Sequence, residues 1–180
     1  MTSIHHTKNG QKFTIRQPTE NDAEAIINHS KLIFESTDQV LTTLDEFAIT
    51  VEQEKAWINS FNQSRNSIVL IAEMNNKILG LLFFIAGPKV KNSHTGEFGV
   101  NVNPAFQGLG IGRKLIETLL QWAKDNKMIE KVFLKVIVTN EKAIRLYKDL
   151  GFIEEGRHIK AIKQLSGEYF DVLQMYVETK

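Results

Sequence analysis

Three glycines at the junction between a strand-like run and an amphipathic helix have the spacing of an anion-binding loop. They lie in Gln107–Gly112, whose sequence is Gln-Gly-Leu-Gly-Ile-Gly. The run before them, Glu97–Asn103, alternates apolar and polar residues and stops at Pro104, which cannot donate to a sheet ladder. The run after them places Ile111, Leu115, Leu119 and Trp122 on one helical face. The first amides of a helix lack intrahelical partners and lie at the positive end of its dipole, so they can bind a pyrophosphate without a basic side chain.

The glycine spacing separates this loop from two nucleotide-binding loops. The dinucleotide-binding pattern G-x-G-x-x-G and the Walker A pattern G-x-x-x-x-G-K-[ST], read from Gly108, both require a glycine where this chain has Arg113. The remaining pattern, Q-x-x-G-x-G, resembles the coenzyme A pyrophosphate loop of the GNAT superfamily of N-acetyltransferases. Taken alone, it is also compatible with a plain glycine-rich turn before a helix.

A second motif lies further along the chain. The β-rich run Lys131–Val136 leads to Asn140, after which Ala143, Ile144, Tyr147 and Leu150 recur at helical spacing. Gly151 is suited to the position just beyond a helix end. The string Asn140–Phe152 resembles the second signature of the same superfamily, N-x-x-A-x-x-L-Y-x-x-x-G-F. The resemblance covers residues 13–177, although the first half resembles the family only in the order of its elements.

The remaining elements fit one α/β domain with a mixed sheet. We predict a strand at Phe13–Arg16, a helix capped by Thr19 and Asp22, a helix opening at Thr50, a hairpin of Ser67–Met74 and Lys77–Ile85 around Asn75-Asn76, and a late antiparallel pair, Phe152–Ile162 and Tyr169–Val177. The resulting order, βααβββαβαββ, predicts a mixed sheet flanked by helices and resembles the GNAT acyl-CoA N-acyltransferase fold. We expect a single domain over residues 1–180 with its core at about 13–177.

The resemblance implies where acetyl-CoA binds. In that fold, the parallel strands that precede the two signatures splay apart, and the pantetheine arm lies between them. Backbone groups of Val100–Asn103 are implied to pair with pantetheine and to polarise the acetyl carbonyl, although which amide does each job stays open. The implied cofactor-binding residues are Val100, Asn101, Val102, Asn103, Gln107, Gly108, Leu109, Gly110, Ile111, Gly112, Arg113 and Asn140. Asn140 also suits a helix N-cap, and one side chain can serve both roles. No metal site is expected.

Acetyl transfer to an amine poses two proton problems. With a pKa near 10.4, only about one primary ammonium in a thousand is deprotonated at neutral pH, so forming the reactive free amine costs roughly 4 kcal/mol. Glu97 matches the place of a glutamate base in several family members, and it equally suits a sheet residue paired to a neighbouring Lys or Thr. Tyr147 matches the family tyrosine that protonates the departing thiolate, and it also suits a core. The chain has no cysteine and no traceable Ser-His-Asp arrangement, so direct transfer is expected.

Composition sets further bounds. The 180 residues are 42% hydrophobic, which suits one globular domain, and the net charge of +1 gives no electrostatic reason to bind nucleic acid or an anionic membrane. The absence of cysteine excludes disulfides and thiolate metal sites and is compatible with the cytoplasm. Met1–Gln11 is polar, which predicts no signal peptide or membrane span. Because termini are usually loose and no further ligand lies near in sequence, we expect His5 and His6 to belong to a frayed terminus rather than to a metal site.

The acceptor is less well defined than the donor. The resemblance assigns acceptor binding to Phe34–Thr50 and Arg157–Asp171, whose carboxylates either attract a cationic amine or are only solvated charge. The late segment Glu155–Arg157, together with Gly167–Tyr169, resembles the subfamily that acetylates protein N-termini, polyamines and amino-acid-like small molecules. We therefore expect a cytoplasmic N-acetyltransferase acting on a primary amine of a small molecule or a peptide N-terminus; a homodimer is compatible with the family. The alternative is a catalytically silent module that binds acetyl-CoA as a sensor or partner-binding domain.

Overall fold

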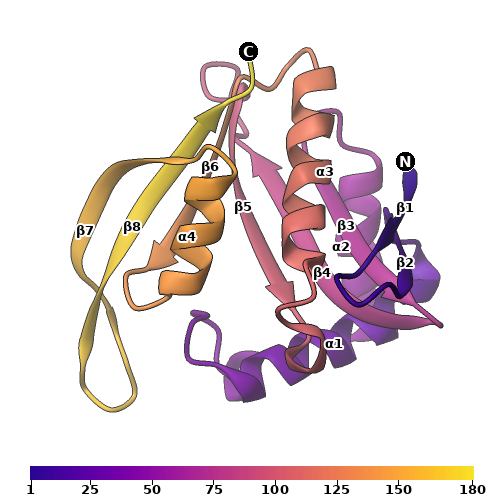
Figure 1. The fold of residues 1–180 in the computed structure, drawn as a ribbon, viewed down its shortest axis with the longest axis horizontal. Helices are drawn as coiled ribbons and strands as arrows, with labels where there is room; N and C mark the ends of the chain where they lie inside the picture. Colours follow the sequence, from indigo (N-terminus) through magenta and orange to yellow (C-terminus); the bar gives the residue numbers. More distant parts are fainter.

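An eight-stranded mixed sheet lies between two layers of helices in the computed structural model, which describes residues 1–180 (Figure 1). In sheet order the strands are β1 (Thr2–His6), β2 (Lys12–Arg16), β3 (Ile68–Met74), β4 (Lys77–Ala86), β5 (Thr95–Val102), β6 (Lys131–Ile137), β8 (Tyr169–Glu178) and β7 (Ile153–Lys163). Helices α1 (Ala23–Ser36) and α2 (Val51–Asn62) cover one face, and α3 (Ile111–Asp125) and α4 (Glu141–Asp149) cover the other. None of these helices combines the length and the apolar character needed to cross a membrane. The predicted mixed α/β fold class is confirmed.

The starts of α1 and α2 are set by capping boxes. Thr50 Oγ1 accepts a hydrogen bond from the Gln53 amide at 3.2 Å, and Gln53 Oε1 accepts one from the Thr50 amide at 2.8 Å. The Thr19 amide donates to Asp22 Oδ2 at 2.7 Å and opens a short 3₁₀ turn that runs into α1. Such a cap contributes about 1 kcal/mol to helix stability. Both predicted helix starts are confirmed.

Turn residues set the hairpin and the end of α4. Asn75 and Asn76 have φ of 52° and 60°, which is left-handed backbone. A two-residue hairpin turn needs this conformation so that its twist matches that of the two strands. Asn75 and Asn76 join β3 and β4 as predicted. Gly151 follows Leu150, the C-cap residue of α4, and has a φ of 90°. A residue with a side chain would be strained in this conformation.

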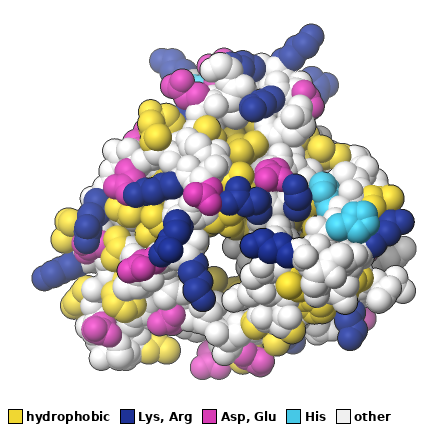
Figure 2. Space-filling model, viewed as in Figure 1, with side chains coloured by type: hydrophobic (Ala, Val, Ile, Leu, Met, Phe, Trp, Pro, Cys, Tyr) yellow, Lys and Arg dark blue, Asp and Glu magenta, His cyan; other side chains and the backbone are white.

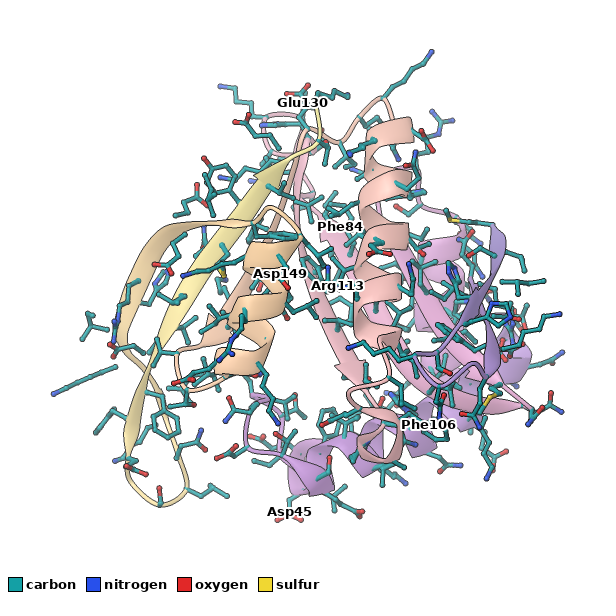
Figure 3. All side chains as sticks on the ribbon, in the orientation of Figure 1. Asp45, Phe84, Phe106, Arg113, Glu130 and Asp149 are labelled. Atoms are coloured by element: carbon teal, nitrogen blue, oxygen red, sulfur yellow. The ribbon has the colours of Figure 1, made fainter.

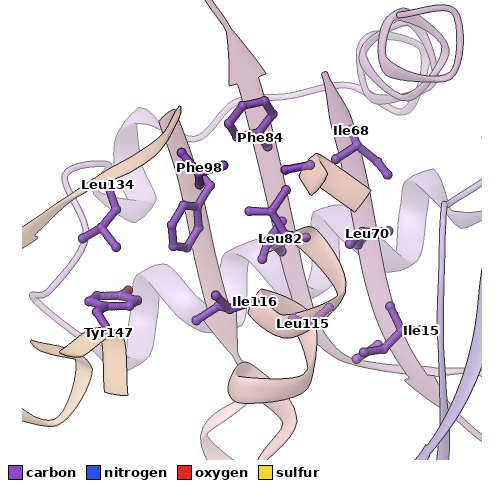
Figure 4. Packing of buried hydrophobic residues seen from close by; sticks show 14 of the residues in the cluster. Ile15, Ile68, Leu70, Leu82, Phe84, Phe98, Leu115, Ile116, Leu134 and Tyr147 are labelled. Atoms are coloured by element: carbon purple, nitrogen blue, oxygen red, sulfur yellow. The ribbon is translucent and has the colours of Figure 1, made fainter. Parts of the chain in front are cut away.

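The sheet is buried on both faces. Along β3, Ile68, Leu70 and Ala72 pack with α3 in the larger core, and the alternate residues Val69 and Ile71 pack with α1 and α2 in the smaller one. Because strand side chains alternate between faces, a continuous apolar run is what such a strand needs. The larger core extends across β4 and β5 to Tyr147 on α4 (Figure 4). This packing holds the ends of β5 and β6 relative to α3 and α4.

The N-terminus is ordered, so the prediction that it frays is wrong. β1 pairs antiparallel with β2, from Thr2 opposite Arg16 to His6 opposite Lys12. The His5 ring lies 5.6 Å from the Phe13 ring, centroid to centroid. An edge strand is stabilised by backbone pairing on one side and needs no continuous apolar face, so a polar terminal segment can be ordered by pairing with its neighbour. The observed order therefore has one strand more than predicted, at the edge beside β2.

Candidate active site

The parallel strands β5 and β6 separate partway along their length. They pair only at Thr95–Lys131, Gly96–Val132 and Glu97–Phe133. Beyond this point β5 continues to pair with β4 as far as Val102, and β6 continues to pair with β8 as far as Ile137. From Phe98 onward, the backbone edge of β5 that faces β6 therefore has no strand partner. The predicted splayed pair is confirmed, and Figure 1 shows the two strands diverging.

The glycine loop lies at the wide end of this opening. A 3₁₀ turn, Pro104–Phe106, follows β5 and leads to Gly108 and Gly110, whose φ values are 78° and 89°. Gly110 is the N-cap residue of α3, and no side chain caps the first amides of the helix. No acidic residue lies in the first helical turn either. The predicted strand-to-helix junction is confirmed, and its free amides suit an anion.

The hairpin turn between β1 and β2 packs against the glycine loop. The Lys8 amide donates a hydrogen bond to the Leu109 carbonyl at 3.0 Å. The Lys8 side chain passes over Gly110, since a Cβ placed on that glycine would lie 3.8 Å from Lys8 Cγ. The strand that was not predicted thus brings a lysine to the loop. Figure 2 shows Lys and Arg side chains around a hollow between the α3 and α4 sides of the molecule.

A cavity of about 960 Å³ extends from the opening between β5 and β6 toward α1 and α2. Among the predicted site residues, its lining includes Glu97, Val100, Asn101, Asn140 and Tyr147. The cavity lining does not include Val102, Asn103 or the glycine loop Gln107–Gly112 with Arg113. The structure thus brings the two predicted catalytic residues into one chamber and leaves the glycine loop outside it.

Tyr147 belongs both to the core and to the cavity wall. It is 8% exposed, and its ring meets those of Phe98 and Phe152 at centroid distances of 6.0 and 5.9 Å. Burial raises the pKa of the Tyr147 hydroxyl to about 12. With this pKa the hydroxyl is protonated at neutral pH. It makes no hydrogen bond within the protein, so it is free to donate one to a molecule in the cavity.

Glu97 is paired with a lysine on the neighbouring strand. Lys135 Nζ lies 3.1 Å from Glu97 Oε2, and both side chains are nearly half exposed. Lys135 stands two residues beyond Phe133, the register partner of Glu97. This is the sheet ion pair that was the alternative to a base.

Four other predicted residues make hydrogen bonds within the protein through their side chains. Asn103 Oδ1 accepts from the Ala105 amide at 3.0 Å, and Gln107 Nε2 donates to the Val102 carbonyl at 3.3 Å. Asn140 Oδ1 accepts from the Ala143 amide at 3.3 Å, which confirms the N-cap. Arg113 donates to Asp149 at 2.8 Å and links α3 to α4 (Figure 3). Two backbone groups of the predicted Val100–Asn103 segment are therefore already hydrogen-bonded within the protein: the Val102 carbonyl accepts from Gln107, and the Asn103 amide donates to the Leu79 carbonyl at 2.8 Å.

Two buried polar residues near the cavity were not predicted. His29 Nε2 on α1 lies 2.6 Å from Asn101 Oδ1, which orients a side chain of the predicted β5 segment. Burial lowers the pKa of His29 more than this hydrogen bond raises it, so the ring is neutral at pH 7. Glu54 on α2 lines the cavity at 7% exposure and has neither an ion pair nor a side-chain hydrogen bond.

A splayed parallel pair thus lies beside a helix that begins at a glycine and whose first amides no side chain caps, the arrangement that the GNAT resemblance implies. Residues 34–152 match the sequence model described as the Acetyltransferase (GNAT) family, and the chain belongs to this family. The protein is 34% identical over 116 residues to a spermidine N(1)-acetyltransferase of Vibrio cholerae. That alignment spans 64% of this chain and 64% of the relative, less than two thirds of its length.

Solved structures share the fold over nearly the whole chain. A GNAT-family acetyltransferase from Streptococcus pneumoniae superimposes with a TM-score of 0.90 at 25% identity, covering 92% of this chain and 99% of its own. The Salmonella typhimurium protein yncA, solved with its cofactor acetyl-CoA, gives a TM-score of 0.83 at 23% identity, covering 94% of this chain and 95% of its own.

Proposed function

We propose that this protein is an acetyl-CoA-dependent N-acetyltransferase that transfers acetyl directly to a primary amine of a small molecule or a peptide N-terminus. The observation that carries the proposal is that the unpaired edge of β5 and the side chain of Tyr147 line the same cavity. We further propose that residues 1–180 form one domain. The net charge of +1 favours a small acceptor over nucleic acid or a membrane surface, and the lack of cysteine is compatible with a cytoplasmic enzyme.

Each part of the site has a task in this proposal. Acetyl-CoA, when bound, supplies the acetyl thioester. The amides at the start of α3, with Gly108 and Gly110, would hold its pyrophosphate, and the free edge of β5 at Val100–Asn103, with Asn140, would hold its pantetheine arm. A backbone N–H of the same β5 segment would stabilise the charge that develops on the carbonyl oxygen. Glu97 would accept the amine proton, and Tyr147 would protonate the departing thiolate.

The proposal is tested by thiol release from acetyl-CoA across polyamines, amino acids, aminoglycosides, arylalkylamines and peptide N-termini. Because the chain has no cysteine, a thiol reagent reports only coenzyme A. We expect turnover with at least one amine. Tight binding of acetyl-CoA by calorimetry, with no turnover on any amine, would instead support the sensor or partner-binding module.

Glu97→Gln is expected to lower kcat most near neutral pH and to recover as the fraction of free amine rises with pH, because a base matters least when the amine is already deprotonated. The measurement is the pH profile of kcat, together with acetyl-CoA affinity, which should not change. Lys135→Met is the matched control, since it breaks the same ion pair and keeps the carboxylate. Equal rate losses in both variants at every pH would show that the pair is structural.

Lys8→Ala is expected to weaken coenzyme A binding about fivefold at low salt, because an exposed charge–phosphate contact is worth about 1 kcal/mol. The loss should shrink at high salt. Calorimetric titration of coenzyme A at two ionic strengths measures both effects. Lys91→Ala, in the exposed loop at the other end of β5, is the control and should leave affinity unchanged. An affinity of Lys8→Ala equal to that of wild type would remove the lysine from the site.

A further inference from the structure

One unpaired carboxylate lies in the part of the cavity that faces α1 and α2. Glu54 is 7% exposed and lines the cavity from α2. Ile58, one helical turn further on, is completely buried, so this side of α2 faces the sheet. No hydrogen bond or ion pair satisfies the carboxylate, and burial raises its pKa. Because the carboxylate faces the cavity and has no partner within the protein, it offers a counter-charge to a cation that enters the cavity.

The lining of the cavity is largely apolar and aromatic. Phe34 and Phe47 meet edge to face at a centroid distance of 4.9 Å, and Trp57 and Phe83 meet edge to face at 6.5 Å. All four line the cavity, together with Val40, Leu41, Ile49 and Leu81. An acceptor that fills this space therefore exchanges water for hydrocarbon and aromatic surface.

The other charges of the lining do not offer a second site for a cation. They are Glu97, Lys135 and His158. Glu97 is already paired with Lys135 at 3.1 Å, and His158 adds no negative charge. Glu54 is thus the one carboxylate of the cavity that is free to pair with an incoming ammonium group.

We propose that Glu54 binds the ammonium group of the acceptor and that the acceptor is a monocationic amine with an apolar body, of the arylalkylamine class. This inference rests on the proposed function and specifies its acceptor. A polyamine carries further ammonium groups, for which the cavity lining offers no second unpaired carboxylate. A carboxylate next to the amine would be repelled by Glu54. The spermidine acetyltransferase that matches part of this chain therefore differs from it in substrate class.

The test compares phenethylamine, spermidine and phenylalanine as acceptors for the wild-type protein and Glu54→Gln. We expect wild-type kcat/KM to be at least about tenfold higher for phenethylamine than for spermidine. Glu54→Gln should raise KM for phenethylamine about tenfold or more with little change in kcat, because a charge-assisted contact of about 1.5–3 kcal/mol is lost. Glu54→Asp should restore part of the affinity. Glu52→Gln, on the exposed side of the same helix, should behave as wild type.

Two further readouts separate binding from structure. Phenethylamine titrated into the complex with coenzyme A should bind the wild type and bind Glu54→Gln about tenfold more weakly, without any reaction taking place. The thermal midpoint of Glu54→Gln at pH 7 should equal or exceed that of wild type, since the substitution removes a carboxyl group that has no partner within the protein.

A preference for spermidine, or an unchanged KM in Glu54→Gln, would overturn the inference and leave the proposed function standing. A lower thermal midpoint with unchanged KM would overturn it as well, because Glu54 would then be structural. If acetyl-CoA binds and no amine of the wider panel is acetylated, the proposed function fails, and the inference fails with it.

Discussion

Tyr147→Phe is expected to lower kcat by roughly 10²-fold or more for any accepted amine, while the thermal midpoint and the acetyl-CoA affinity stay close to those of wild type. The phenylalanine ring keeps the edge-to-face contacts with Phe98 and Phe152. The substitution removes only a hydroxyl that has no hydrogen bond within the protein, so little stability depends on it. Steady-state kinetics, thermal unfolding and calorimetry on the same preparation measure the three quantities.

The raised pKa of Tyr147 also predicts how the wild-type rate depends on pH. With a value of about 12, the hydroxyl stays protonated across the assay range, so its deprotonation should not slow the wild-type enzyme as the pH rises from neutrality. Tyr176→Phe, on β8, is the matched control and should retain full kcat. Full kcat in Tyr147→Phe would leave solvent as the proton source. A fall in the thermal midpoint without a rate loss would assign Tyr147 to the core alone.

The elements that were predicted correctly are those whose signals are local. Thr50 and Gln53 cap each other across one helical turn, and Asn75-Asn76 adopt the positive φ that their hairpin needs whatever lies around them. β1 was missed because Thr2–His6 is stabilised by hydrogen bonds to β2, which leave no trace in its own composition. Lys8 was missed for the same reason, since the turn that carries it depends on that pairing.

In the candidate site, too, the features with a local sequence signal could be predicted and those that depend on long-range pairing could not. Gly108 and Gly110 could be predicted because an anion-binding helix start needs glycine at positive φ within a few residues. The pairing of Glu97 with Lys135 depends on the register of two strands far apart in the sequence, and no local pattern fixes it.

Glu54 and His29 did leave a local signal. Glu54 lies three and four residues before Trp57 and Ile58, and His29 lies between Ile26 and Ile33, so each is a polar residue on the inward face of its helix. The helical period places both side chains toward the sheet. It does not show that a cavity opens beside Glu54, because that space is formed by residues from α1, α2, α4, the strands β4 to β8 and the segment between α1 and α2 together.

Gly110→Asp is expected to weaken coenzyme A binding about 100-fold or more, because a carboxylate about 4 Å from a phosphate charge costs up to roughly 4 kcal/mol at an effective dielectric constant of 20. The fold should survive, since the nearest atom to an added Cβ is the flexible Lys8 side chain at 3.8 Å. Calorimetric titration of coenzyme A measures the affinity, and thermal unfolding measures the stability.

Two variants separate charge from backbone strain in that experiment. Gly167→Asp places the same side chain at a φ of 90° in the turn between β7 and β8, where nothing lies within 4 Å, so it shares the strain and should keep wild-type affinity. Gly110→Asn has nearly the shape of the aspartate variant without its charge, and should lose much less affinity. If Gly110→Asp binds coenzyme A as tightly as wild type, the pyrophosphate does not lie at the start of α3. Because the loss is electrostatic, it should also diminish as ionic strength rises, whereas a loss caused by a distorted loop would not.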